Sequence, residues 1–161
     1  MMWRSRNRIG SDAGGALVEL AVSLPVLALV LVGTIDFARV FYTAIALTNA
    51  ARAGAQYGGQ SIGSSADLPG ITAAAATAAP NIGAFDVDAQ PVTCRCATDD
   101  GSSFSAPQSC SDACTGGTHR VATVTVTTSK TFNLLASGFP GVPDNIDLSR
   151  TATSRVPGVA D

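Results

Sequence analysis

The sequence has few charged residues, few aromatic residues and a single histidine. Charged residues make up 14% and aromatic residues 6% of the 161 residues, and the formal net charge is −2. A chain without an overall basic charge lacks the field that attracts nucleic acid, so no nucleic-acid partner is expected. The sequence also lacks a phosphate-binding loop and a nucleophile-elbow motif. We therefore expect no enzyme activity, no cofactor and no metal site.

Large apolar side chains are scarce in the C-terminal two thirds of the chain. Residues 60–161 are rich in Ala, Thr, Ser and Gly. About 100 residues of this composition can form only a marginal hydrophobic core. This part of the chain is therefore expected to need cross-links or partners for stability.

The long apolar run of the chain lies near its N-terminus. Residues 1–12 contain three arginines, and residues 13–35 contain one charged residue, Glu19. As a helix, residues 13–35 would measure about 35 Å, which exceeds the roughly 30 Å of a bilayer core. Since backbone groups in lipid must be paired internally, we predict a transmembrane helix over 13–35.

The charges around this run predict its orientation. Residues 1–12 are basic, whereas Asp36 and Arg39 after the run have opposite charges. This asymmetry predicts a cytoplasmic N-terminus and an extracytoplasmic remainder. A cleaved signal peptide is the alternative, because it has the same basic start. The length of the run and its carboxylate favour a retained helix.

Two residues within the run need an explanation. Pro25 removes a backbone donor and is expected to kink or loosen the helix, although transmembrane helices tolerate proline. Glu19 is costly in lipid and indicates a functional partner, unless it reaches the headgroups from its position near the start of the run.

Residues 36–59 are predicted to continue the same helix beyond the membrane as an amphipathic segment. The segment contains no proline and ends in glycines, and Asp36 and Arg39 are spaced to form an ion pair. Its predicted apolar stripe has helical spacing and consists of Phe37, Phe41, Ala44, Leu47 and Ala51. This stripe would pack on the outer domain or on neighbouring subunits.

Residues 60–161 are predicted to form an extracytoplasmic α+β domain. The predicted elements are a Gly/Ser loop over 60–68, a short helix over 69–79, and strands over 85–93, 119–132 and 145–156. Alternation of Thr with Ala and Val in the second strand is typical of a half-buried antiparallel strand. The fold class is therefore α+β: a long N-terminal transmembrane helix that continues into a small antiparallel sheet domain with disulfides.

The four cysteines, Cys94, Cys96, Cys110 and Cys114, are predicted to lie in one loop between two strands. Outside the cytoplasm disulfides persist, so we predict two disulfides that join the first two cysteines to the last two. Both cross-pairings remain open. A zinc site is the alternative, but the spacing is unusual for one. His119 is expected to be an exposed residue at a strand edge.

The N-terminal residues resemble a known family. Gly14-Gly15-Ala16-Leu17-Val18-Glu19 resembles the processing motif of type IV pilins. The segments 19–27, 33–39 and 47–55 are similar to the TadE-like family, the pilin-like proteins of the bacterial tight-adherence (Flp) pilus system. The resemblance is dense over residues 14–57 and looser over 120–126 and 148–156.

The resemblance implies a mechanism for assembly. A prepilin peptidase would cut after Gly14, Gly15 would gain a free amine, and Glu19 would become the fifth mature residue. In pilin assemblies such a glutamate meets the terminal amine of a neighbouring subunit, which avoids two unpaired charges in hydrocarbon. Pro25 and the Asp36/Arg39 pair are further candidate assembly residues.

The resemblance also implies a role and a location. The chain is longer than major Flp pilins, and Leu20 stands where they commonly have tyrosine, which fits a minor pilin or pilin-like subunit. The implied partners are the lipid bilayer, other pilin-like subunits, the pilus assembly platform and a prepilin peptidase. The implied location is single-pass in the bacterial inner membrane, with the C-terminal domain periplasmic or extracellular. The alternative function is an uncleaved, membrane-anchored periplasmic binding or scaffold module of a secretion system.

Overall fold

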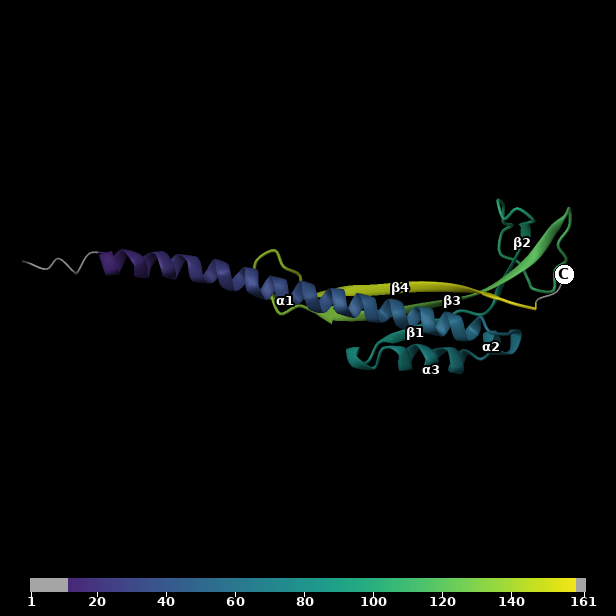
Figure 1. Cartoon of the computed structure of the whole chain (residues 1–161), viewed down its shortest axis with the longest axis horizontal. Coiled ribbons are helices and arrows are strands. Elements are labelled where there is room, and N and C mark those ends of the chain that lie inside the picture. Colours follow the sequence, from purple (N-terminus) through teal and green to yellow (C-terminus); the bar gives the residue numbers. More distant parts are fainter. Residues whose placement is uncertain (1–11, 159–161) are drawn as a thin grey trace, which may run out of the picture.

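The structure is a computed structural model that describes residues 12–158. One helix, α1 (Asp12–Gly58), accounts for 47 residues and extends well beyond the rest of the molecule (Figure 1). The basic leader predicted from the sequence lies almost wholly outside the described residues. Among residues 12–158, α1 is the one helix long and apolar enough to cross a membrane, and its most apolar part is not buried by the rest of the chain.

Helix α1 runs without interruption through Pro25. Polar side chains in its apolar part bond to their own helix: Ser23 donates to the Glu19 carbonyl oxygen at 2.8 Å, and Thr34 donates to the Val30 carbonyl oxygen at 2.7 Å. Back-bonding of this kind satisfies a hydroxyl that has no water to bind. The apolar part of α1 is therefore compatible with lipid on every side except at Glu19.

The sheet is built around its third strand, and all its strand pairs are antiparallel. Strand β3 (Thr118–Asn133) pairs along one edge with β4 (Asn145–Val156). Its other edge is shared by β1 (Asp86–Ala89) and β2 (Thr93–Thr98). This antiparallel sheet and the long helix confirm the predicted α+β class, and the two long strands closely match the predicted ones.

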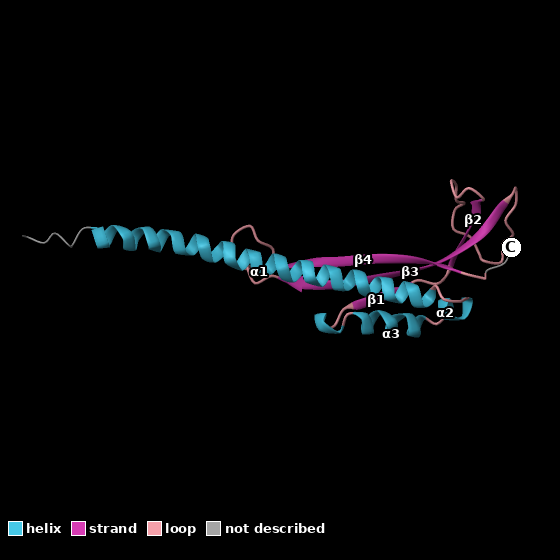
Figure 2. Cartoon of the chain, in the orientation of Figure 1, coloured by secondary structure: helices cyan, strands magenta, loops and turns pink. Residues whose placement is uncertain are grey.

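The C-terminal half of α1 lies along the sheet (Figure 2). Alternate residues of β3 face the helix, including the buried Val124, Val126 and Thr128. Helix α3 (Leu68–Ala78) packs beside α1 at a point where Gly54 of α1 allows close approach: a Cβ on Gly54 would stand 3.2 Å from the Ile71 carbonyl oxygen. The α3 helix confirms the predicted helix over 69–79.

The connection between α1 and α3 differs from the predicted Gly/Ser loop. Residues Ile62–Ala66 form a short helix, α2, and residues Pro80–Ile82 after α3 form a 3-10 turn, η1. Helix α2 starts here because the Ser61 side chain accepts a hydrogen bond from the Ser64 N–H at 3.1 Å. A single serine cap thus turns a sequence rich in loop residues into one turn of helix.

The helix stripe predicted from the sequence is only partly covered by the sheet domain. Leu47 and Ala51 are buried against the sheet domain, but Phe37 and Phe41 are 71% and 59% exposed. The two rings stack on one another, with centroids 6.2 Å apart, on a side of α1 that the domain does not cover. Periodicity found the helix but did not identify the face it buries near Asp36.

Candidate functional site

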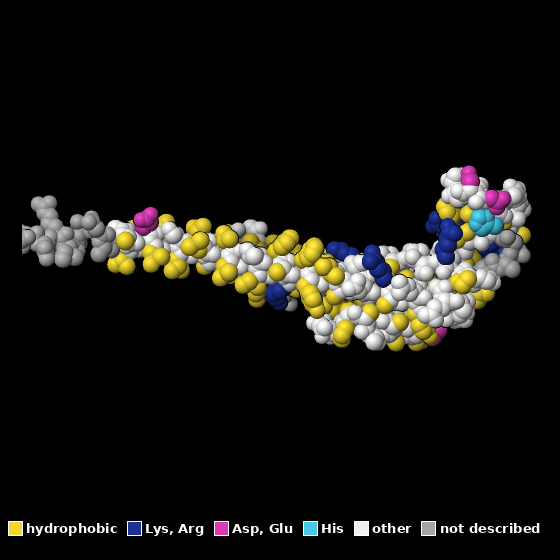
Figure 3. All heavy atoms as spheres, in the orientation of Figure 1, with side chains coloured by type: hydrophobic (Ala, Val, Ile, Leu, Met, Phe, Trp, Pro, Cys, Tyr) yellow, Lys and Arg dark blue, Asp and Glu magenta, His cyan; other side chains and the backbone are white. Residues whose placement is uncertain are grey.

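Helix α1 divides into an exposed apolar half, residues 14–35, and a half that is docked on the sheet domain. In Figure 3, hydrophobic side chains cover the N-terminal half of the helix, while the dark blue basic side chains lie farther along the molecule. The exposed large side chains include Leu17, Val18, Leu20, Val22, Leu24, Val26 and Leu27. An apolar surface of this extent on one bare helix is stable only in lipid or against other helices.

Glu19 stands in this exposed apolar half. Its side chain is exposed, and within residues 12–158 no hydrogen bond or ion pair reaches its carboxylate. A carboxylate in hydrocarbon requires a partner. Any partner for Glu19 in the membrane must therefore come from outside the described part of this chain.

Gly14 and Gly15 lie in the first turn of α1, and a Cβ on either would meet no atom within 4 Å. The first four N–H groups of a helix have no intrahelical acceptor, and each glycine lowers helix stability by about 1 kcal/mol relative to alanine. The bond between the two glycines therefore lies in a weak, accessible turn.

Asp36 joins the exposed apolar half of α1 to the sheet domain. Its carboxylate accepts hydrogen bonds from the backbone N–H groups of Leu135, at 2.9 Å, and Ala136, at 2.8 Å. Arg39 lies 3.4 Å from the same carboxylate and places its guanidinium 4.9 Å from the centre of the Phe132 ring. The sequence predicts the Asp36–Arg39 pair, and the structure adds that both residues hold the end of β3.

The environment of Asp36 has opposing effects on its pKa. Burial of the carboxyl raises the pKa, but the two backbone donors and then the charge and hydrogen bond of Arg39 outweigh it, so that the pKa is lowered. Asp36 is thus held as a carboxylate at the point where α1 leaves its exposed apolar half. The partners from residues 135 and 136, a hundred positions away, carry no signal in the sequence.

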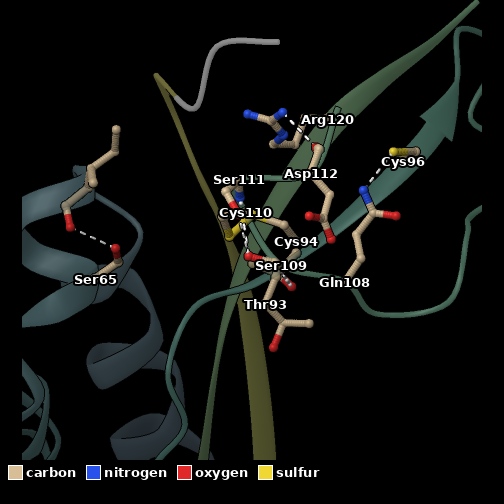
Figure 4. The surroundings of a disulfide bond; sticks show 12 residues. Ser65, Thr93, Cys94, Cys96, Gln108, Ser109, Cys110, Ser111, Asp112 and Arg120 are labelled. Atoms are coloured by element: carbon tan, nitrogen blue, oxygen red, sulfur yellow. Dashed lines mark hydrogen bonds between the residues drawn. A yellow bond between two sulfur atoms is a disulfide. The ribbon is translucent and has the colours of Figure 1, made fainter. Parts of the chain in front are cut away.

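A second candidate cluster is at the far end of the sheet, where one disulfide joins Cys94 to Cys110 (Figure 4). Another disulfide joins Cys96 to Cys114. This is one of the two cross-pairings left open by the sequence. The predicted placement of all cysteines in one loop is wrong, since Cys94 and Cys96 lie on β2. The zinc alternative is contradicted, because all the thiols are oxidised.

Besides the two disulfides, polar contacts hold the segment that carries the last two cysteines. Gln108 approaches Cys96 Sγ with its amide nitrogen at 3.1 Å, and Arg120 donates to the Asp112 carbonyl oxygen at 2.8 Å. His119, at the neighbouring end of β3, lies 3.3 Å from Asp99 with both side chains exposed. Among residues 12–158 no group of three potential ligand residues could hold a metal ion. This end of the domain is a cross-linked surface.

Comparison with known proteins places the family signal on α1. The family model described as TadE-like protein matches residues 14–56. The match begins at the first glycine of the Gly14–Gly15 pair, contains Glu19, Pro25, Asp36 and Arg39, and ends in the last turn of α1. No curated protein and no solved structure matches the chain. This match agrees with the resemblance to the TadE-like family that the sequence carries over residues 14–57.

Proposed function

We propose that this chain, whose helix α1 carries the TadE-like family sequence, is a minor pilin or pilin-like subunit that acts in assembly of a tight-adherence pilus. The family is one of Tad pilus-associated, pilin-like structural proteins. One observation carries the proposal: α1 presents an apolar half in which Glu19 has no partner among residues 12–158, while its other half is docked on the sheet domain. A helix of this kind is suited to pack against like helices in a membrane or filament.

The proposed mechanism begins with processing by a prepilin peptidase after Gly14. Hydrolysis of this bond would release the basic leader and create an ammonium group on Gly15. The weak first turn of α1 supports access of a peptidase to this bond. The ammonium group of one subunit would then pair with Glu19 of its neighbour and fix the axial position of the two helices.

In this proposal, the exposed aromatic surface of α1 and the sheet domain have separate roles. The stacked Phe37 and Phe41 rings supply a second exposed apolar surface for a neighbouring helix, immediately beyond the exposed apolar half of α1. The sheet domain would face the periplasm or the exterior. Its disulfides lie at the end away from the exposed apolar half of α1. We place the chain in the bacterial inner membrane with a cytoplasmic N-terminus.

The test is the N-terminal sequence and intact mass of the protein recovered from membranes, with and without an active prepilin peptidase. The proposal predicts a start at Gly15 that depends on the peptidase. Gly14→Val should block this cleavage, whereas Gly33→Val, at another exposed glycine of α1 with open space around it, should not. A start at Met1 or Met2 in the presence of the peptidase would refute processing and leave a permanently anchored accessory or scaffold subunit.

A further inference from the structure

The loop that connects β3 to β4, residues 134–144, is attached to α1 at the end of its exposed apolar half. The backbone N–H groups of Leu135 and Ala136 both donate to Asp36. Asp36 is the first charged residue after the apolar run that starts beyond Asp12, apart from Glu19. In a membrane-anchored chain, Asp36 therefore lies at the surface of the bilayer, and so does the start of this loop.

The β3–β4 loop extends from this point toward the exposed apolar half of α1. Figure 1 shows the loop projecting beyond the ends of β3 and β4, alongside α1, in the direction of its N-terminus. The loop is thus directed toward lipid and away from the body of the sheet domain.

The composition of the β3–β4 loop fits lipid rather than water. From 134 to 143 it contains no charged residue, and Leu135 and Phe139 are 57% and 47% exposed. Its polar backbone is partly satisfied: the Phe139 N–H donates to Ala136 O at 3.3 Å, and the Val142 N–H donates to Phe139 O at 3.1 Å. The prolines at 140 and 143 have no N–H to desolvate.

We propose that the β3–β4 loop inserts Leu135 and Phe139 into the headgroup–acyl boundary of the bilayer that α1 crosses. Apolar side chains on an otherwise uncharged segment favour this interfacial depth. Together with α1, the loop gives the domain a second membrane contact, which fixes its tilt and its rotation about the helix. The inference rests on the membrane anchoring in the proposed function, and not on processing or filament assembly.

The test uses the full-length protein in phosphatidylcholine vesicles with bromine at defined depths of the acyl chains, which quenches tryptophan fluorescence. Trp3 is replaced by Phe, and single tryptophans are introduced by Phe139→Trp or Leu135→Trp. The matched control is Phe104→Trp, since Phe104 is also 47% exposed but lies beyond β2 near the disulfides. Leu24→Trp, within the apolar half of α1, reports on the anchor itself.

The inference predicts quenching at positions 139 and 135 that is strongest for shallow bromine, quenching at position 24 that is strongest for deep bromine, and none at position 104. If position 24 is quenched while 139 and 135 behave like 104, the loop insertion is wrong and the anchor stands. A blue-shifted emission at 139 without quenching by lipid would also overturn it, and would indicate cover by a second protein chain. If position 24 is not quenched, the anchoring fails, and the loop insertion with it.

Discussion

Thr128 of β3 donates a hydrogen bond from its buried hydroxyl to the backbone carbonyl oxygen of Leu47 in α1, at 2.9 Å and across 81 residues of sequence. Both residues are fully buried. The bond fixes the position of the docked half of α1 along the sheet, because it joins one helix carbonyl to one strand residue.

Replacing the Thr128 hydroxyl by a methyl group tests this contact. Thr128→Val keeps the shape of the side chain, and the Leu47 carbonyl keeps its intrahelical partner, so we expect a loss of about 1 kcal/mol in the free energy of unfolding. Thr127→Val is the control, since Thr127 points to the other face and its hydroxyl lies 3.0 Å from that of Thr151. Denaturant unfolding of the detergent-solubilised protein measures both; equal losses would contradict a specific role for Thr128.

Asp36 makes the attachment of the β3–β4 loop sensitive to acid. Because its pKa is lowered by folding, its carboxylate stabilises the folded state above about pH 4, and this contribution is lost as the pH falls through the lowered pKa. Asp36→Asn should therefore weaken the pH dependence of stability below about pH 4. It should also speed hydrogen exchange of the Leu135 and Ala136 amides by about tenfold at neutral pH.

The control for Asp36 is Asp144→Asn, at the other end of the same loop. The Asp144 carboxylate makes no hydrogen bond to residues 12–158, and only its backbone oxygen accepts one, from the Leu134 N–H at 3.1 Å. This variant should leave the exchange of the two amides unchanged. Equal exchange rates in Asp36→Asn and in the unmodified chain would refute the attachment.

The disulfide pairing can be read directly from peptides of the unreduced protein. Trypsin cleaves after the exposed Arg95, which separates Cys94 from Cys96. A second protease that cleaves before aspartate would cut at Asp112, which separates Cys110 from Cys114. Mass spectrometry of the double digest should find the 94–110 and 96–114 pairs. The pairs 94–114 and 96–110 would contradict the structure. In the chain-entropy model, disulfides between cysteines 16 and 18 residues apart each add about 3 kcal/mol to the free energy of unfolding.

Gly59, directly after α1, is required for the approach of β4. A Cβ at this position would stand 2.9 Å from the Ser154 Cβ and 3.0 Å from the Arg155 carbonyl oxygen. Gly59→Ala should therefore cost about 1–3 kcal/mol in the free energy of unfolding. Gly63→Ala, in α2, should be neutral or stabilising, because a Cβ there would approach no atom closer than Ser61 Oγ at 3.7 Å. A neutral result for Gly59→Ala would show that β4 can move away without cost.

Glu19 is expected to act between chains and not within one. Glu19→Gln should leave membrane insertion and domain folding intact but abolish or strongly reduce co-purification and cross-linking with pilin-like subunits. Ser23→Ala is the control, because the Ser23 hydroxyl is already bonded to its own helix. Unchanged cross-linking in Glu19→Gln would refute the pairing of Glu19 with a neighbouring amine.

The sequence predicts those parts of the fold that have a strong local signal. Helix α1 follows from a long apolar run that continues into good helix formers, and β3 and β4 follow from clear alternation. Strand β2 has no such signal: Cys94 is buried in the core and Cys96 half-buried, and their strand character comes from pairing with β3. A short cysteine-rich segment that becomes a strand only through a distant partner is read as a loop.

The face of α1 that the domain covers was harder to predict than the helix itself. Phe37 and Phe41 fit a stripe with Leu47, but the covered face near the exposed apolar half is fixed by Asp36, to which the backbone N–H groups of residues 135 and 136 donate. A contact across a hundred residues leaves no periodic trace. The candidate site residues on α1 were identified from the sequence, whereas the partners of Asp36 required the structure.

The position of the disulfides has a consequence for the order in which the molecule matures. Of the three hydrophobic clusters formed by residues 12–158, the one around Leu47 and the one around Ala50 contain no cysteine. The Cys96–Cys114 bridge belongs to none of the clusters. We therefore expect the part of the domain that contains these two clusters to fold before any thiol is oxidised. The end that carries the disulfides would take its final shape only after oxidation. Exposure to an oxidising compartment would then act as the last step that readies the outer surface for use.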